Sequence, residues 1–131
     1  MSILKKLFNT NAETKKDVTA NVHWVSITDI SQLDALTEAS KAETVLIFKH
    51  STRCGISKMV FRQFEKSFKT FDKIITVYYL DLLNYREISD EIAARFQVFH
   101  QSPQLIVLKN GVMVANASHY DILELEYVSL I

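Results

Sequence analysis

The order of its apolar segments constrains the fold of this chain more than any other feature of the sequence. Segments rich in β-branched or aromatic residues alternate with segments in which apolar residues recur at helical spacing. The strand-like segments are residues 22–27, 44–48 and 73–80. The helix-like segments follow them at residues 28–36, 55–70 and 88–96. This alternation predicts parallel strands joined by right-handed crossovers.

The C-terminal part of the sequence predicts an antiparallel hairpin. Asn110-Gly111 lies between the apolar segments 104–108 and 112–115, and this dipeptide favours a type I′ turn because both central positions need positive φ. The segment from Ser118 to Asp121 resembles a capping box and predicts a final helix. The fold class is therefore α/β, with a central mixed sheet of three parallel strands plus the hairpin and with helices on both faces.

Local patterns give more detailed expectations for two helices. Thr28 or Asp29 is expected to cap the first helix. Its buried face is expected to carry Ile30, Leu33 and Leu36. The buried face of the second helix is expected to carry Ile56, Met59, Val60, Phe64 and Phe68.

Composition limits the number of domains and the kinds of partner. The chain has 131 residues, of which 48% are hydrophobic, so we expect one domain at 22–131 after a polar lead-in at 1–21. Fifteen basic residues balance fifteen acidic ones, which gives no reason to expect nucleic acid as a partner. No apolar run is long enough to span a membrane and no signal peptide is evident. We expect a cytoplasmic monomer.

A single cysteine, Cys54, lies where a strand is expected to run into a helix. One cysteine excludes an internal disulfide, and with four scattered histidines it gives no basis for a metal site. A thiol at a helix N-terminus faces unpaired N–H groups and the positive end of the helix dipole, and both favour the thiolate. No acidic residue occurs between Glu43 and Glu65. The cations near the cysteine in sequence are Lys49, His50, Arg53, Lys58 and Arg62. The alternative is a buried, inert cysteine.

Three segments resemble those of a known family. Residues 50–57 read His50-Ser51-Thr52-Arg53-Cys54-Gly55-Ile56-Ser57. They resemble the active-site motif of the monothiol bacilliredoxins, which reads His-Ser-x-x-Cys-Pro-Ile-Ser and belongs to a thioredoxin-like fold. Gly55 stands where the family has proline. Ser102-Pro103-Gln104 and Ala117-Ser118-His119-x-x-Ile122 also match, and the resemblance covers about residues 22–131.

The resemblance implies thiol–disulfide exchange with Cys54 as the nucleophile. It also implies that client proteins carry a low-molecular-weight thiol, bacillithiol, which acts as the co-substrate, and that no cofactor is bound. Ser57 occupies the position of the resolving cysteine of two-cysteine redoxins, so a mixed disulfide on Cys54 must be resolved by an external thiol.

Supporting roles are expected for four residues around the cysteine. Arg53 stabilises the thiolate, contacts a carboxylate of bacillithiol or is a solvated loop cation. Gly55 leaves its N–H free to donate to the sulfur. Ser57 hydrogen-bonds either the sulfur or the backbone. His50 orients the loop or shuttles protons, with a structural role favoured.

The resemblance also implies that Pro103 follows a cis peptide bond and faces the thiol. The backbone of Ser102 would then pair with an extended client segment. The alternative is a trans proline that begins an edge strand. For function as a whole, the alternatives are a redox-inactive adaptor that keeps the fold, or the same chemistry with another small thiol such as glutathione.

Overall fold

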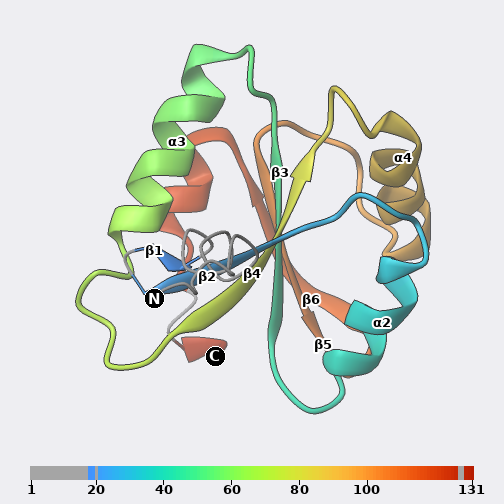
Figure 1. The fold of residues 1–131 in the computed structure, drawn as a ribbon, viewed down its shortest axis with the longest axis horizontal. Helices are drawn as coiled ribbons and strands as arrows, with labels where there is room; N and C mark the ends of the chain where they lie inside the picture. The colour runs from blue at the N-terminus through green and yellow to red at the C-terminus, as the bar shows by residue number, and fades with distance from the viewer. Residues whose placement is uncertain (1–17, 20, 127–128) are drawn as a thin grey trace, which may run out of the picture.

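A six-stranded mixed sheet forms the centre of the computed structural model, which describes residues 18–19, 21–126 and 129–131 (Figure 1). The strands are β1 (Val18–Thr19), β2 (Val22–Ser26), β3 (Val45–His50), β4 (Ile75–Asp81), β5 (Gln104–Lys109) and β6 (Val112–Ser118). The helices are α2 (Gln32–Ala39), α3 (Gly55–Lys66), α4 (Arg86–Arg95) and the 3₁₀-helix η1 (His119–Glu124).

The strand order is β1-β2-β4-β3-β5-β6. β2 and β3 pair in parallel with β4, whereas β5 is antiparallel to β3 and β6 is antiparallel to β5. The predicted combination of three parallel strands with a C-terminal antiparallel hairpin is confirmed. β1 pairs antiparallel with β2, within the segment that we expected as a lead-in. The remainder of that segment, residues 1–17 and 20, lies outside the described residues.

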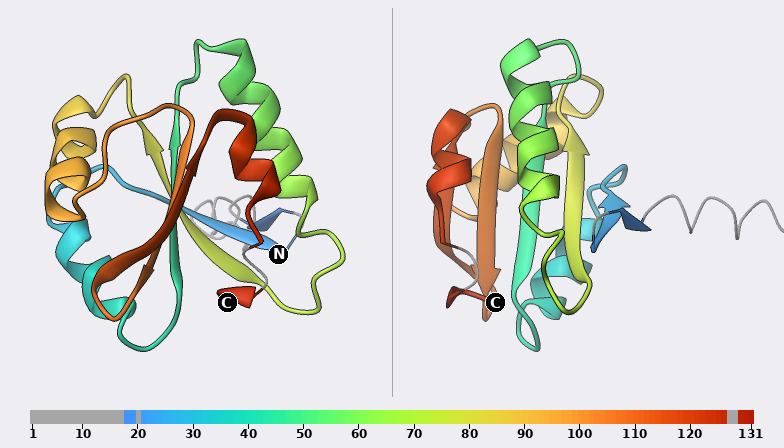
Figure 2. Two further views of the ribbon diagram at one scale, coloured as in Figure 1. Left: turned by 180° about the vertical axis from the view of Figure 1, so that it is seen from behind. Right: turned by 90° about the vertical axis from the view of Figure 1, so that its left-hand side faces the viewer.

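Helices cover both faces of the sheet, as predicted. Figures 1 and 2 show α3 and η1 on one face and α2 and α4 on the other. All six residues of β3 are buried, because this strand lies between β4 and β5 and is covered on both faces. Its alternate residues enter two separate cores. Leu46 and Phe48 pack on the α3 side, and Val45 and Ile47 pack on the α2 and α4 side.

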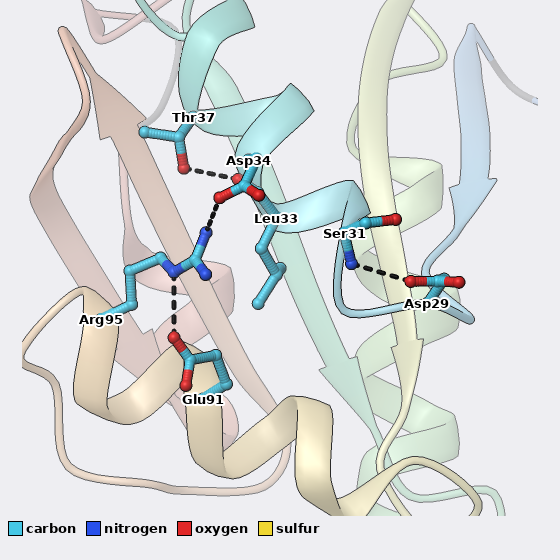
Figure 3. A network of polar contacts seen from close by, with 7 residues as sticks. All are labelled: Asp29, Ser31, Leu33, Asp34, Thr37, Glu91 and Arg95. Carbon is cyan, nitrogen blue, oxygen red and sulfur yellow. Dashed lines mark hydrogen bonds and ion pairs between the residues drawn. The ribbon is translucent and has the colours of Figure 1, made fainter.

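Arg95 joins the two helices on that second face (Figure 3). Its Nη1 lies 2.9 Å from Asp34 Oδ1 of α2, and its Nε lies 3.1 Å from Glu91 Oε2 of its own helix. The Asp34 side chain is 80% exposed. Solvent-exposed pairs of this kind each contribute at most about 1 kcal/mol. The buried apolar residues therefore supply most of the stability of this layer.

The predicted start of the first helix was wrong. α2 begins at Gln32, and Ser31 in the N-cap position makes no side-chain capping bond. Asp29 stabilises the turn that precedes the helix, since its Oδ1 accepts the N–H of Ser31 (2.8 Å; Figure 3). This turn rotates Ile30 away from the core, and its side chain is 46% exposed.

The predicted buried face of α3 was partly wrong. Val60 and Phe64 are buried as expected, but Ile56 and Met59 are 44% and 39% exposed. The buried position in the first turn belongs to Ser57, because residues three and seven positions later on the same helix face are Val60 and Phe64. Ile56 is one residue out of phase with that face, and α3 ends at Lys66 rather than at residue 70.

The hairpin turn agrees with the prediction and the last helix does not. Asn110 and Gly111 have φ values of 53° and 80°, as a type I′ turn requires. The C-terminal element is a 3₁₀-helix, and Ser118 makes no side-chain capping bond. His119 has a φ of 56°, so the chain enters η1 through a left-handed residue, which is incompatible with a capping box.

Candidate active site

Cys54 is the N-cap residue of α3, with φ −105° and ψ 124°. Its N–H donates to Ser51 O (3.2 Å) and its carbonyl oxygen accepts the N–H of Lys58 (3.0 Å). The sulfur is a free thiol on a partly exposed residue. The first N–H groups of a helix have no acceptor within the helix, so the cysteine lies beside donors and the positive end of the dipole. This is the position that the sequence predicted.

Ser57 is fully buried one turn into α3 and hydrogen-bonds to His50. Its Oγ lies 2.7 Å from His50 Nδ1 and accepts the N–H of Ser51 at 3.0 Å. Within the described residues, no hydrogen bond reaches the sulfur of Cys54. The hydroxyl therefore holds the end of β3 and the turn that leads to Cys54 against the first turn of α3.

His50 is buried among aromatic rings. Its ring stacks on Phe61 with centroids 4.9 Å apart and meets Tyr79 edge-on at 5.7 Å. Burial lowers the pKa of His50; the carboxylate of Asp81 opposes this effect and the ammonium of Lys58 adds to it. The lowered pKa favours the neutral imidazole, so His50 adds less to the cationic surroundings of the cysteine than the sequence suggested.

Lys49 is also removed from the cationic surroundings that the sequence suggested. It is fully buried, and strand alternation directs it to the face opposite His50. Its Nζ donates to Ser89 O at 3.2 Å and to His100 Nδ1 at 3.3 Å. Burial lowers the pKa of Lys49 to about 8, against an opposing effect of Asp90. The exposed cations closest to Cys54 in sequence are therefore Arg53 and Lys58. Arg62 is also exposed, one helical turn after Lys58.

The peptide bond between Ser102 and Pro103 is cis, which confirms the expectation from the resemblance. Lys49 pairs with Gln104 in the antiparallel register of β3 and β5, so Pro103 is placed next to His50 at the end of β3. Figure 1 shows the N-terminus of α3 and the segment that leads into β5 at the same edge of the sheet. Pro103 is buried, and its carbonyl oxygen accepts the N–H of His119 (3.0 Å).

Side chains on the α4 face hold the loop that precedes this proline. Ser89 Oγ lies 3.2 Å from His100 Nδ1, the ring nitrogen that Lys49 Nζ also contacts. Gln104, which is fully buried, donates through Nε2 to Phe99 O (3.0 Å) and accepts the N–H of Gln101 through Oε1 (3.3 Å). The loop is therefore fixed on both sides of His100.

The model of the monothiol bacilliredoxin BrxC family matches residues 25–126 of the chain. The chain belongs to this family. The match includes the cysteine, the His50–Ser57 pair and the cis-proline segment, so the family resemblance given by the three sequence segments is confirmed.

Solved structures agree on the fold. A protein assigned provisionally as an oxidoreductase with a thioredoxin fold is 36% identical over 76% of this chain and 85% of its own, with a TM-score of 0.67. The thioredoxin of Malassezia sympodialis is 25% identical over 76% of this chain and 81% of its own, with a TM-score of 0.60. The thioredoxin of Schistosoma mansoni is 21% identical, covering 81% of this chain and 91% of its own, with a TM-score of 0.59.

Family and fold together make the chain a thiol–disulfide oxidoreductase with a thioredoxin fold. Among residues 18–19, 21–126 and 129–131, no group of His, Cys, Asp or Glu side chains is arranged to hold a metal ion. None of the helices in this part of the chain has the length and hydropathy that crossing a membrane requires.

Sequence reasoning placed Cys54, His50, Ser57 and Pro103 at one edge but missed the residues that hold them. Lys49 was counted as a surface cation, although it continues a strand that is apolar on both faces, which was a signal of an inward side chain. Asp81, the partner of His50 in the parallel register, had no local signal, because only the pairing of β3 with β4 brings the two together.

Proposed function

We propose that the chain removes a low-molecular-weight thiol, bacillithiol in particular, from protein mixed disulfides through Cys54. The thiolate of Cys54 attacks the sulfur of the small thiol in the client's mixed disulfide. The old S–S bond breaks, a new one forms between Cys54 and the small thiol, and the client cysteine leaves as a thiolate. A second small thiol then attacks the adduct and leaves as a symmetrical disulfide, which returns Cys54 to the thiol. Overall, the client cysteine is reduced and one free small thiol is oxidised, because the small thiol on the client was already part of a disulfide.

The single observation that carries this proposal is the place of the one cysteine of the sequence at the N-cap of α3, with Ser57 three residues later. The position favours a reactive thiolate, and a serine hydroxyl cannot resolve a mixed disulfide. An external thiol must therefore complete each turnover. Arg53, which is exposed beside the cysteine, is suited to a carboxylate of the small thiol.

We further propose that the backbone at Ser102, before the cis-proline, pairs with an extended segment of the client. Family membership supports bacillithiol as the small thiol, and a reducing cytoplasm suits a free cysteine. The working form is proposed to be a monomer, because one copy carries the cysteine, the His50–Ser57 pair and the proline at a single edge.

The test is a dethiolation assay on one client protein that carries either bacillithiol or glutathione on a single cysteine. We expect faster release of bacillithiol, and no turnover with Cys54→Ser, since a hydroxyl does not replace a thiolate. Equal release of both thiols would retain the chemistry and refute the bacillithiol preference. Release by Cys54→Ser at the wild-type rate would refute the proposed reaction.

A further inference from the structure

The outer face of α3 carries a row of cations that begins beside the cysteine. Lys58, Arg62 and Lys66 are exposed and follow one another at intervals of four residues, so they lie on one side of the helix. Met59 is exposed and borders the row, three residues before Arg62 on the helix. We call Lys58, Met59, Arg62 and Lys66 the α3 docking face. The charge of Lys58 reaches the site itself, because it contributes to lowering the pKa of His50.

No carboxylate neutralises the row within the part of the chain that the structure describes. The ion pairs there are formed by Lys41 with Glu38 and by Arg95 with Asp34 and Glu91. The one acidic residue of α3, Glu65, is half-buried and accepts the indole N–H of Trp24 at 2.7 Å. Like charges four residues apart repel, and a cation near a helix N-terminus opposes the dipole. The repulsion within the row and the place of Lys58 in the first turn therefore cost helix stability, which an anionic partner would restore.

The length of the row indicates the size of that partner. At a rise of 1.5 Å per residue, Lys58, Arg62 and Lys66 lie about 6, 12 and 18 Å from Cys54 along the helix axis. A small thiol of tripeptide size spans at most about 10 Å when extended, so one bound to Cys54 cannot reach Lys66. A polypeptide that continues from the reacting cysteine of a client can reach all three cations.

We propose that the α3 docking face binds an acidic, extended segment of the client protein that flanks its modified cysteine. This inference rests on the proposed dethiolation and names the class of client. Alternate residues of an extended chain are about 6.6 Å apart, close to the ~6 Å between cations four residues apart on α3. The matching client segment carries Asp or Glu at every second position, so that its acidic side chains all face the cations of α3.

The test uses synthetic peptides with one cysteine held as a mixed disulfide with bacillithiol. There are two acidic peptides with Glu at every second position. The first carries these residues before the cysteine and the second carries them after it. Matched peptides carry Gln or Lys at the same positions. We expect kcat/KM for one acidic peptide to exceed that of its Gln counterpart by about tenfold at low salt. The Lys peptide reacts more slowly than both. The contrast disappears near 1 M salt, where the Debye length is about 3 Å.

Charge reversal of the two cations that lie farther from Cys54 provides the test variants. Arg62→Glu and Lys66→Glu should each abolish most of the preference for the acidic peptide and favour the Lys peptide. Lys66→Glu should leave reaction with the symmetrical disulfide of the small thiol unchanged, because Lys66 lies beyond the reach of a small thiol bound to Cys54. Lys41→Glu, an equal charge change at a residue beyond α2 on the opposite face, is the control and should keep the wild-type preference.

The outcomes separate this proposal from the one on which it rests. Dethiolation of the Glu, Gln and Lys peptides at equal rates would overturn the docking face and leave the reaction in place. An equal effect of Lys41→Glu would also overturn it. Reaction with none of the peptides would overturn both proposals. The chain could instead bind duplex DNA or anionic vesicles through Arg62 and Lys66 and show no preference for the acidic peptides. That result would overturn the acidic client segment as the partner of the α3 docking face.

Discussion

His50 Nδ1 lies 2.7 Å from Ser57 Oγ, and this buried contact joins the last residue of β3 to the first turn of α3 on either side of Cys54. The same hydroxyl accepts the N–H of Ser51. One serine side chain thus determines where the turn that carries the cysteine lies relative to the sheet. Its position in sequence is that of the second cysteine in dithiol redoxins.

Replacing Ser57 with alanine should destabilise the fold. Ser57→Ala leaves the N–H of Ser51 and the imidazole of His50 without their partner, and a buried unsatisfied polar group costs about 1–3 kcal/mol. Urea denaturation measures the change in the free energy of unfolding. Ser67→Ala is the control, because Ser67 Oγ donates to Phe64 O at the exposed end of the same helix and should cost less than about 0.5 kcal/mol. Equal losses in the two variants would contradict this role of Ser57.

Replacing Ser57 with cysteine should remove the need for an external thiol in the second half-reaction. In Ser57→Cys, the new thiol lies three residues after the N-cap, one turn along the helix. It can attack the mixed disulfide on Cys54, form an internal disulfide and release the small thiol. Intact-mass spectrometry of the isolated adduct, without added thiol, should show loss of the small thiol in the variant and a persistent adduct in the wild type. A persistent adduct in both would contradict the prediction.

Replacing Gly55 with proline, the residue of the family motif, should stabilise the protein. A Cβ added to Gly55 meets no atom within 4 Å, and Cys54 already has the extended conformation that a residue before proline must adopt. Proline is favoured at the first helical position. We expect Gly55→Pro to raise the free energy of unfolding by about 0.4–1 kcal/mol, because the unfolded chain loses entropy. Thermal denaturation measures this change.

Gly111 provides a control for that substitution, because replacing this glycine should lower the stability rather than raise it. Its φ of 80° belongs to the left-handed region, so Gly111→Ala should destabilise by about 1 kcal/mol although its Cβ would find only ordinary van der Waals contact. A loss of stability in Gly55→Pro comparable with that of Gly111→Ala would show that position 55 requires glycine.

Replacing the buried lysine should stabilise the protein at neutral pH. Lys49 is charged below its pKa of about 8, and its burial disfavours that charge. We expect Lys49→Met to unfold with a free energy about 1–3 kcal/mol higher at pH 7, because a methionine fills the same space without a buried charge. Exposed Lys73→Met should differ from the wild type by less than about 0.5 kcal/mol.

The advantage of Lys49→Met should shrink as the pH rises. Between pH 8 and 10.5, Lys49 is neutral in the folded protein but still protonated in the unfolded chain, so the unfolded state binds more protons and wild-type stability gains relative to the variant. Urea denaturation of both proteins from pH 7 to 10.5 measures the gap. A gap that stays constant over that range would contradict a lowered pKa for Lys49.

Much of the fold followed from the sequence because its signals are local. The alternation of strands and helices and the Asn110-Gly111 turn are local patterns, and both were confirmed. The errors arose where tertiary contacts overrode local pattern. Ser57 took the buried position that Ile56 was expected to share, and its hydroxyl has a partner in His50 at the end of β3.

The site was predictable only to the extent that it is continuous in sequence. The motif around Cys54 identified the nucleophile, and Pro103 was placed by the family resemblance. His100, in the loop before Pro103, contacts Lys49 of β3 and Ser89 of α4, and these three residues are far apart in sequence. No periodicity or motif encodes such a contact, since it depends on β3 lying between β4 and β5 and on α4 packing over it.

The most direct test of the account follows the small thiol from client to Cys54. A client protein with bacillithiol on one cysteine is mixed with an equal amount of the reduced chain, and both are followed by intact-mass spectrometry. We predict that the client loses one bacillithiol as the chain gains one, with the adduct mapped to Cys54 and absent in Cys54→Ser. A client that is unchanged, with no adduct on the chain, would contradict the assignment of Cys54 as the nucleophile in dethiolation.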